Sequence, residues 1–426
     1  MTEQGTHPEN PEHSAEDIPY SDAPPKPEAH LHPNILVLTA VSFLTDISSE
    51  MLINLLPLFL FSVLGVQTAA IGLIEGIAET TASLVKIYSG ALSDKLGKRK
   101  LLAVIGYGLS TIAKPFLYFA NTWTGVLLVR FTDRVGKGIR TAPRDAILAG
   151  SASSDKRGLA FGLHRAGDTA GAFVGILIAT TLIWINQTGT SQLSLDTYQL
   201  VVLASIIPAT LAVLILILGA REIETTPKTN SSTLSLRFGW KELSPQFHAF
   251  LGVMILFTLG NSSDAFIILR GQERGLTVLQ IMGMMLTFTA VYTLLSTPAG
   301  ALSDRVGRKK LILAGWLVYA LVYLGLAWAQ SSYQVWVLAA LYGAYYALTE
   351  GTAKAYVADL VPQIQQGTAY GFFNAAIGLS TLPASLIAGI LWQGLGSWGG
   401  LGPAAPFLFG AIMAILAGIL LIVWLR

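Results

Sequence analysis

The sequence predicts an all-α integral membrane protein, with 12 transmembrane helices arranged as two six-helix parallel repeats. Hydrophobic residues make up 53% of the 426 residues and charged residues only 12%, whereas soluble proteins average about 25% charged residues. About twelve segments reach the roughly 20 mostly apolar residues that a helix needs to cross a bilayer. The string GALSDKLGKRK at Gly90–Lys100 returns as GALSDRVGRKK at Gly300–Lys310, which indicates an internal duplication.

Six predicted spans precede a polar stretch and six follow it. The spans of the first half are 35–64, 68–92, 101–120, 122–147, 158–186 and 197–220. Those of the second half are 247–270, 276–302, 311–329, 333–356, 367–392 and 404–425. The polar stretch contains TTPKTNSST, which is typical of a linker. We therefore expect a six-helix bundle over 34–220, a central cytoplasmic loop over 221–246 and a second bundle over 247–426.

Residues 1–33 differ from the rest of the chain. They are rich in Glu, Asp, Pro and His and contain no apolar run, which predicts a disordered acidic cytoplasmic tail. A signal peptide is not expected, because the basic and short apolar regions that define one are both missing. The histidines of this segment are irregularly spaced, which favours a solvated tail over a metal site.

Basic residues indicate the orientation of the spans. They gather in the loops that follow even-numbered spans, namely Lys95, Lys98, Arg99 and Lys100, Lys156 and Arg157, and Arg305, Arg308, Lys309 and Lys310. The loops on the other side hold almost no Lys or Arg. The positive-inside rule then predicts that both termini are cytoplasmic, in a multi-pass protein of the bacterial inner membrane. Because each half has an even number of spans, the two copies share one orientation, which is a parallel repeat.

The two halves also match outside the repeated loop. Ser48-Ser49-Glu50 corresponds to Ser262-Ser263-Asp264, and Gly158–Gly162 corresponds to Gly367–Gly371. Over residues 35–426 the sequence resembles the major facilitator superfamily, whose loop signature, roughly G-x-L-a-D-r-x-G-r-k, is similar to the repeated string. Arg130 and the following FTDRVGKG resemble the arginine motif of that family's fourth helix, with Asp133 and Arg134 where Gln and Gly are common. The string DRVGKGIRTAPRDAILA resembles a bacterial subgroup whose substrate is unassigned. The resemblance implies that the fourth helix contributes to the interior and to a cytoplasmic gate.

Charged residues inside a bilayer cost about 2.5 to 3.5 kcal/mol each, so they are expected to face a cavity or a partner. Asp46 and Glu50 are one helical turn apart, and Asp46 lies roughly 18 Å into its helix. Burial disfavours the charged form, so these carboxyl groups are candidates for proton coupling; the alternative is a static pair with an arginine such as Arg130. His164, Arg165 and Asp168 on the fifth helix are candidates for a proton relay, although an isolated histidine is more often a satisfied polar residue.

Further intramembrane polar residues are candidates for the substrate cavity. They are Glu75, Glu79, Arg130 and Arg134 in the first half, and Asp264, Tyr346, Glu350, Lys354 and Asn374 in the second. Three alternatives stay open. Glu75 and Glu79 could instead neutralise the basic residues of the fourth helix, and Arg130 and Arg134 on that helix could either hold an anionic substrate or be paired internally. Glu350 could neutralise Lys354. Gly167, Gly171 and Gly175 at spacing four predict close helix packing.

The repeated loops and the lower part of the fourth helix are expected to form a gate. An acid in a compact loop can pair with a cation or a helix N-terminus in one conformation and release it in another. The candidates are Gly90, Asp94, Gly97, Arg99, Arg140, Arg144, Asp145, Gly300, Asp304, Gly307 and Arg308. Topology explains the basic residues of these loops but does not explain the acids.

These observations predict a secondary active transporter and not an enzyme. The chain has no cysteine, no phosphate-loop spacing and no regular metal-ligand cluster, so we expect no cofactor and no metal. We expect a proton-coupled carrier of a small organic solute that works by alternating access, with export favoured. Import of a small anionic metabolite is the alternative, and a membrane sensor without turnover is a third. The expected partners are the substrate, a proton or sodium ion and the lipid bilayer, with no nucleic acid, and we expect a monomer.

Overall fold

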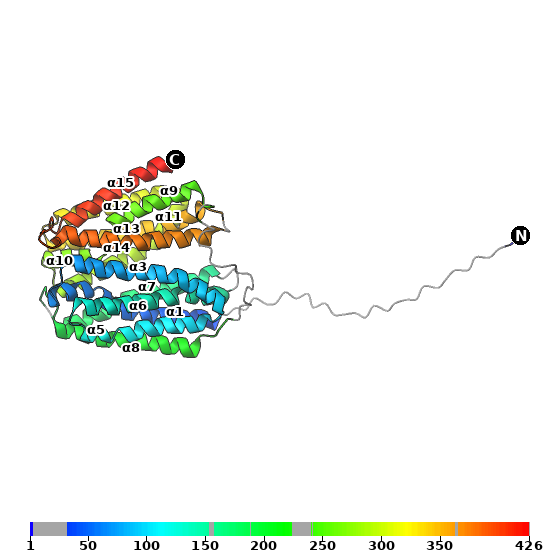
Figure 1. Ribbon diagram of the computed structural model, residues 1–426, viewed down its shortest axis with the longest axis horizontal. Helices are drawn as coiled ribbons and strands as arrows, with labels where there is room; N and C mark the ends of the chain where they lie inside the picture. Colours follow the sequence, from blue (N-terminus) through cyan, green and yellow to red (C-terminus); the bar gives the residue numbers. More distant parts are fainter. Residues whose placement is uncertain are drawn as a thin grey trace. The chain divides into compact units, whose positions relative to one another are not determined.

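The computed structural model describes residues 1–2, 32–152, 157–187, 189–223, 240, 242–362 and 365–425. The helices belong to one compact unit that begins at His32 (Figure 1). Most of the predicted N-terminal tail and most of the predicted central loop lie outside the described residues.

The first half contains six membrane passes. The first is made by α1 (Pro33–Ile53), α2 (Leu56–Leu58) and the π-helical η1 (Phe59–Val63). The others are α3 (Thr68–Leu96), α4 (Arg99–Ala113) with α5 (Phe116–Phe119), α6 (Trp123–Gly150), α7 (Arg157–Asn186) and α8 (Leu195–Gly219). Pro115 separates α4 from α5, because proline lacks the N–H that a helix interior requires.

The second half repeats this pattern. It consists of α9 (Pro245–Gly260) with α10 (Ala265–Glu273), α11 (Val278–Val306), α12 (Arg308–Trp328), α13 (Ser332–Asp359), α14 (Gln366–Gln393) and α15 (Ala405–Trp424). Twelve passes therefore appear among the described residues, and the predicted all-α membrane fold is confirmed. Ten of them are long and apolar enough to span a bilayer by composition alone. The other two, α6 and α13, are less apolar because they carry many charged residues or tyrosines.

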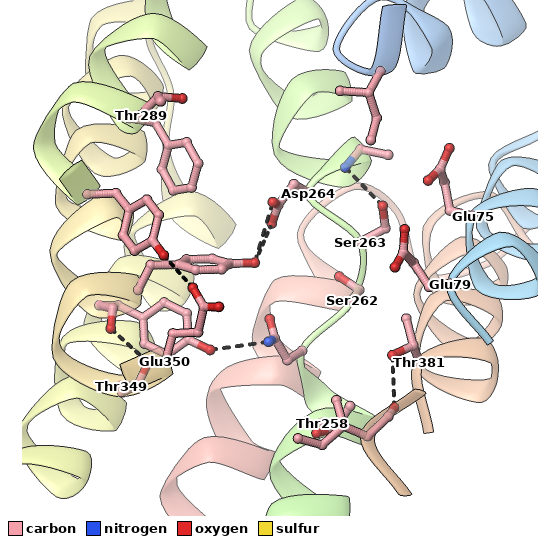
Figure 2. Close-up of a pocket in the computed structure, with 18 of the residues that line it drawn as sticks. Glu75, Glu79, Thr258, Ser262, Ser263, Asp264, Thr289, Thr349, Glu350 and Thr381 are labelled. Carbon is pink, nitrogen blue, oxygen red and sulfur yellow. Dashed lines mark hydrogen bonds between the residues drawn. The ribbon is translucent and has the colours of Figure 1, made fainter. Parts of the chain in front are cut away.

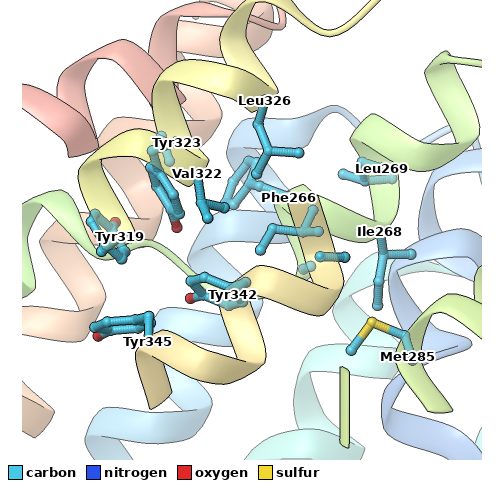
Figure 3. Packing of buried hydrophobic residues seen from close by; sticks show 14 of the residues in the cluster. Phe266, Ile268, Leu269, Met285, Tyr319, Val322, Tyr323, Leu326, Tyr342 and Tyr345 are labelled. Atoms are coloured by element: carbon cyan, nitrogen blue, oxygen red, sulfur yellow. The ribbon is translucent and has the colours of Figure 1, made fainter. Parts of the chain in front are cut away.

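Each half has its own packing core. In the first, α1 packs against α7 and α8, and α6 packs against α3 and α4. Gly167, Gly171 and Gly175 of α7 lie directly on α1, where a Cβ at Gly171 would come within 2.3 Å of the Phe43 carbonyl oxygen. The predicted close packing is confirmed. The second half is built around a buried aromatic cluster that includes Tyr319, Tyr323, Tyr342 and Tyr345 (Figure 3).

The halves meet mainly where α3 packs on α14 and where α7 packs on α11. Glycines let the backbones of α3 and α14 approach closely. A Cβ at Gly72 would come within 2.1 Å of the Ser385 carbonyl oxygen, and one at Gly389 within 2.4 Å of the Thr68 carbonyl oxygen. Close approach of this kind is how small residues join helices in membranes.

We name the two ends of the helical unit by their residues. The basic end carries Arg99, Lys100, Arg308 and Lys309, and the opposite end carries Thr68 and Gln393. At the opposite end the halves are joined by hydrogen bonds, because the Thr68 N–H donates to the Gln393 side chain at 2.9 Å and Thr68 Oγ1 donates to the Gly389 carbonyl at 2.9 Å. Further bonds run from Val278 N–H and the Gln272 side chain to carbonyls of the 187–194 loop. The opposite end is therefore closed.

Candidate functional site

A cavity of about 690 Å³ lies between the two halves (Figure 2). Its walls come from α1, α2, α3 and α7 of the first half and from α9, α10, α11, α12, α13 and α14 of the second. Side chains nearer the basic end are more open to solvent: the side chains of Arg165 and Lys354 are 59% and 51% exposed. Because the opposite end is closed, we infer that the cavity opens toward the basic end.

Acidic residues dominate the charged part of the cavity wall. Among the residues that the structure describes, seven carboxylates line it, against two basic side chains, Arg165 and Lys354. Glu75, Glu79 and Glu350 each have an Arg or Lys partner. Among the described residues, Asp46, Glu50 and Asp264 form no ion pair. Glu50 instead accepts a hydrogen bond from the side-chain amide of Asn54 at 3.3 Å.

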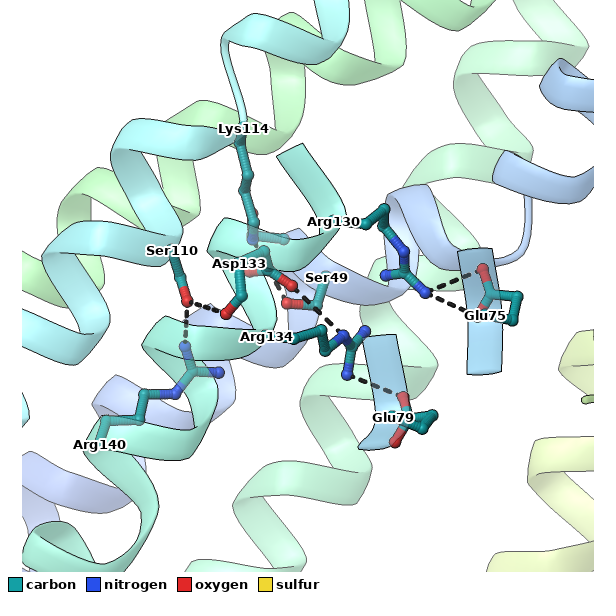
Figure 4. Close-up of polar contacts among 10 residues, drawn as sticks. Ser49, Glu75, Glu79, Ser110, Lys114, Arg130, Asp133, Arg134 and Arg140 are labelled. Atoms are coloured by element: carbon teal, nitrogen blue, oxygen red, sulfur yellow. Dashed lines mark hydrogen bonds and ion pairs between the residues drawn. The ribbon is translucent and has the colours of Figure 1, made fainter. Parts of the chain in front are cut away.

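The arginines predicted to line the cavity lie behind its wall, where each faces a glutamate. Figure 4 shows these contacts. Arg130 donates to both oxygens of Glu75, at 2.8 and 3.0 Å, and both side chains are buried. Arg134 lies 3.1 Å from Glu79 and 3.6 Å from Asp133. The glutamates therefore do both things left open by the sequence, since they line the cavity and neutralise the fourth membrane pass.

Other cations of the first half also bond within it. Lys114, at the break between α4 and α5, donates to Ser48 Oγ at 2.5 Å and to Ser49 Oγ at 3.3 Å. Arg140 donates to Ser110 Oγ at 2.8 Å and lies over the ring of Tyr107 at 4.5 Å from its centroid. The Lys114 contacts join the end of α4 to α1, and the Arg140 contacts join α6 to α4.

The residues of the predicted proton relay occupy different surroundings. Arg165 and Asp168 line the cavity, whereas His164 is buried beside it with Nδ1 3.6 Å from Asp168 Oδ2. Arg165 donates to the Tyr292 hydroxyl at 2.9 Å, and that hydroxyl donates to Glu350 at 2.5 Å. This chain of contacts crosses from α7 in the first half to α11 and α13 in the second.

Asp264 lies where the seventh membrane pass is broken. Residues 261–264 are not helical, and Asn and Ser are residues whose side chains compete with backbone hydrogen bonds in a helix. The carboxylate accepts a hydrogen bond from Tyr342 at 3.0 Å and weaker contacts from Tyr346 at 3.5 Å. Figure 2 shows Asp264 between Glu350 on one side and Glu75 and Glu79 on the other. Asn374, another predicted residue, also lines the cavity and is exposed.

The predicted gating residues lie toward the basic end. Gly97 and Gly307 have positive φ angles of 63° and 100° and end α3 and α11. Arg308 pairs with Asp359 at 3.0 Å and with Asp304 at 3.6 Å, while the side chain of Asp94 lies outside the described residues.

The remaining gating candidates come from both halves and lie toward the basic end. A Cβ at Gly90 would contact Ala142 at 3.5 Å, whereas one at Gly300 would meet open space. The backbone N–H of Arg99 donates to Glu222 at 2.9 Å. Arg144 pairs with Asp145 at 2.8 Å and donates to Ser42 of α1 at 3.3 Å.

Sequence reasoning missed several residues of the site. Tyr292, Phe288 and Asn261 line the cavity, but an isolated Tyr, Phe or Asn in an apolar span gives no signal of its own. Arg270 shows the reverse case, because it is an intramembrane charge that lies outside the cavity. It is fully buried and donates from Nε and Nη2 to the Leu326 and Ala327 carbonyls at 2.9 Å. These hydrogen bonds provide partners for carbonyl groups at the end of α12, which have none within the helix.

Comparisons with known proteins agree with this architecture. The Major Facilitator Superfamily profile matches residues 38–269 and 249–426. An uncharacterized MFS-type transporter of Methanocaldococcus jannaschii is 36% identical over 401 residues, which are 93% of this chain and 96% of that one. Multidrug resistance protein MdtG of Escherichia fergusonii is 23% identical over 323 residues, which are 73% of this chain and 76% of that one.

Solved structures share the fold at low sequence identity. A crystal structure of the nucleoside transporter NupG has a TM-score of 0.73 at 14% identity and covers 92% of this chain and 99% of its own. A D-xylose-proton symporter has a TM-score of 0.72 at 15% identity, covering 91% and 96%. These likenesses show the fold alone. On the profile match and the 36% identical relative, the chain belongs to the major facilitator superfamily of membrane transporters.

Proposed function

We propose that this protein is a proton-coupled secondary transporter that exports a small organic solute by alternating access. The observation that carries the proposal is the pair Asp46 and Glu50, two carboxylates in the cavity wall that form no ion pair among the described residues. They lie one turn apart on α1 and are the only charged residues of the first membrane pass. A carboxylate without a counter-charge in such a position is costly to ionise, which makes it suited to carry a proton.

The proximity of the two carboxylates strengthens this role. Like charges disfavour simultaneous ionisation, so the pair can hold one proton between them while the cavity is open to one side. Asp168 of α7 lines the same cavity and contacts His164 at 3.6 Å. We assign these two residues to proton passage between the pair and the aqueous side.

Alternating access would come from rocking of the two halves, residues 34–220 and 247–426. Positive-inside counting places the basic end, with both termini, in the cytoplasm of a bacterial cell. The structure then corresponds to an inward-open form with the outer side closed. The Arg165–Tyr292–Glu350 chain links the halves at the level of the cavity, and its contacts are the ones that rocking must change.

Two observations favour export of an organic compound over import of an anion. Arg130 and Arg134, on which anion binding would depend, are engaged with Glu75 and Glu79 behind the cavity wall. The relative MdtG is named for multidrug resistance, which supports efflux. A sensor without turnover is the less favoured alternative, because binding alone does not call for two adjacent carboxylates without ion pairs in the cavity wall.

Reconstituted liposomes test the proposal. With an imposed pH gradient, flux of a candidate compound should exceed flux without a gradient, and Asp46→Asn or Glu50→Gln should lose this dependence on the gradient. Asp196→Asn, in the exposed first turn of α8, is the control and should transport as the parent protein does. A sodium gradient in place of the pH gradient separates the two coupling ions. Unchanged pH-driven flux in both carboxyl variants would remove Asp46 and Glu50 from the coupling role.

A further inference from the structure

Asp264 is surrounded by hydrogen-bond donors that carry no charge. Its oxygens contact the hydroxyl groups of Tyr342 and Tyr346, and Asn261, three residues earlier, contacts Tyr342 and Tyr345. Asp264 precedes α10 but makes no capping hydrogen bond with its side chain. The carboxylate is therefore not used to end a helix, and it faces the cavity instead.

Aromatic rings form the wall next to this carboxylate. Phe288 and Tyr292 lie 5.5 and 5.8 Å from Tyr346 between ring centroids. On the other side Phe257 stacks on Trp316 at 4.6 Å, and both residues line the cavity. Aromatic faces attract cations, and the attraction is strongest where water is excluded.

The charge of the cavity wall also favours a cationic ligand. In the part of the chain that the structure describes, seven carboxylates and two basic side chains line the cavity, and both basic side chains contact Glu350. Its volume of about 690 Å³ lies within the range of about 300–1,000 Å³ found for sites that hold drug-sized molecules. An anion would meet repulsion in this cavity, and a cation would not.

The internal repeat separates this carboxylate from the coupling pair. Asp264 corresponds to Glu50 in the duplicated halves, and the position that corresponds to Asp46 is Gly260. The second half therefore has one carboxylate, bonded to tyrosines, where the first half has two adjacent ones. A single carboxylate with fixed neutral donors is suited to hold a charged group of a ligand, whereas an adjacent pair is suited to exchange a proton.

We infer that Asp264, Tyr342 and Tyr346 form the recognition site for an organic cation that also carries aromatic or apolar groups. This inference rests on the proposed transport function and names its substrate class. The positive group lies against Asp264, and its apolar groups lie against Phe288, Phe257 and Trp316. Asp46 and Glu50 remain the coupling pair on the facing wall.

Binding to the purified full-length protein in detergent tests this site without any gradient. The probes are tetraphenylphosphonium and benzyltrimethylammonium, with tetraphenylborate as an anion of the same shape as the first. We expect saturable binding of at least one cation and none of the anion. Asp264→Asn should weaken cation binding by about tenfold or more, because a charged partner is lost. Asp264→Glu should recover part of the binding, and Asp196→Asn should leave it unchanged.

Unchanged cation binding in Asp264→Asn, or anion binding equal to that of the cations, would overturn the site. Failure of both cations to bind the parent protein would overturn it as well. If Asp264→Asn does not fold, as judged by size-exclusion chromatography, Tyr346→Phe keeps the ring, removes the hydroxyl and should still weaken binding several-fold. Proton-driven flux of an uncharged solute together with no cation binding would reject this site and leave the transport proposal standing. Cation binding without gradient-driven flux would support this site and reject the transport proposal.

Discussion

At the scale of single residues, the ion pair between Glu75 and Arg130 contributes to stability, and only its glutamate lines the cavity. Both side chains are more than nine-tenths buried, at 8% and 7% exposure. A buried pair is worth little more than a well-packed apolar pair, but removing one partner leaves an uncompensated charge. Glu79 differs because its side chain is 43% exposed and its partner Arg134 also contacts Asp133.

We predict that Glu75→Gln destabilises the protein by about 3–5 kcal/mol, because Arg130 is then buried without a counter-charge. Thermal unfolding in detergent measures this loss. Glu79→Gln should have a clearly smaller effect, since Arg134 keeps Asp133. Replacing both members, as Glu75→Gln with Arg130→Met, should recover much of the stability. Equal melting temperatures for Glu75→Gln and Glu79→Gln would contradict the asymmetry.

At the scale of helices, glycines allow close packing at two different contacts. Glycines of α7 pack on α1 inside the first half, and glycines of α3 and α14 pack across the two halves. If the halves rock during transport, the first contact persists and the second must separate at the opposite end. Substitutions in α3 should therefore change the balance between conformations and not the integrity of one half.

We predict that Gly72→Ala weakens the closed opposite end, since its Cβ would lie 2.1 Å from the Ser385 carbonyl oxygen. The chain has no cysteine, so Ser385→Cys, at a fully buried position, reports on this contact without background. A membrane-impermeant maleimide should label it several times faster with Gly72→Ala than without. Gly108→Ala, where a Cβ meets nothing within 4 Å, is the matched control. Equal labelling in all three proteins would show that the contact does not limit opening.

At the scale of the whole molecule, α14 spans the closed contact and the open cavity. Asn374 is exposed toward the cavity, and Ser385 is buried against α3. The two residues are 11 positions apart, or about 16 Å along the helix. Alternating access requires that these two positions exchange their accessibility.

We therefore predict opposite responses at Asn374→Cys and Ser385→Cys. In the conformation described here the first should react with maleimide and the second should not. Conditions that favour the outward-open form should protect position 374 and expose position 385. Asp196→Cys, on an exposed turn at the opposite end, should react throughout. Parallel changes at 374 and 385 would argue against rocking of the halves.

The number of membrane passes was predictable because a bilayer imposes a length and an apolar composition on each one. The directions in which the side chains point were less predictable. Helical spacing placed Arg130 and Arg134 on one face of α6 but could not decide whether that face meets the cavity or α3. The tyrosines around Asp264 lie some 80 positions away in the chain, and no local pattern links them. The break at residues 261–264 also depends on these tertiary contacts, since Asn and Ser are tolerated in many membrane helices.

One hydrogen bond between the halves has a consequence for how they separate. The Thr80 hydroxyl donates to the Gly378 carbonyl of α14 at 2.6 Å, whereas Thr45, Thr169 and Thr381 each donate to the carbonyl four residues earlier in their own helix. When α3 leaves α14, Thr80 can rotate to the Gly76 carbonyl and keep a bond. The Gly378 carbonyl keeps its own helical partner in either case. Separation of the halves at this point would therefore exchange one hydrogen bond for another, and the threonine hydroxyl would have a partner in both conformations.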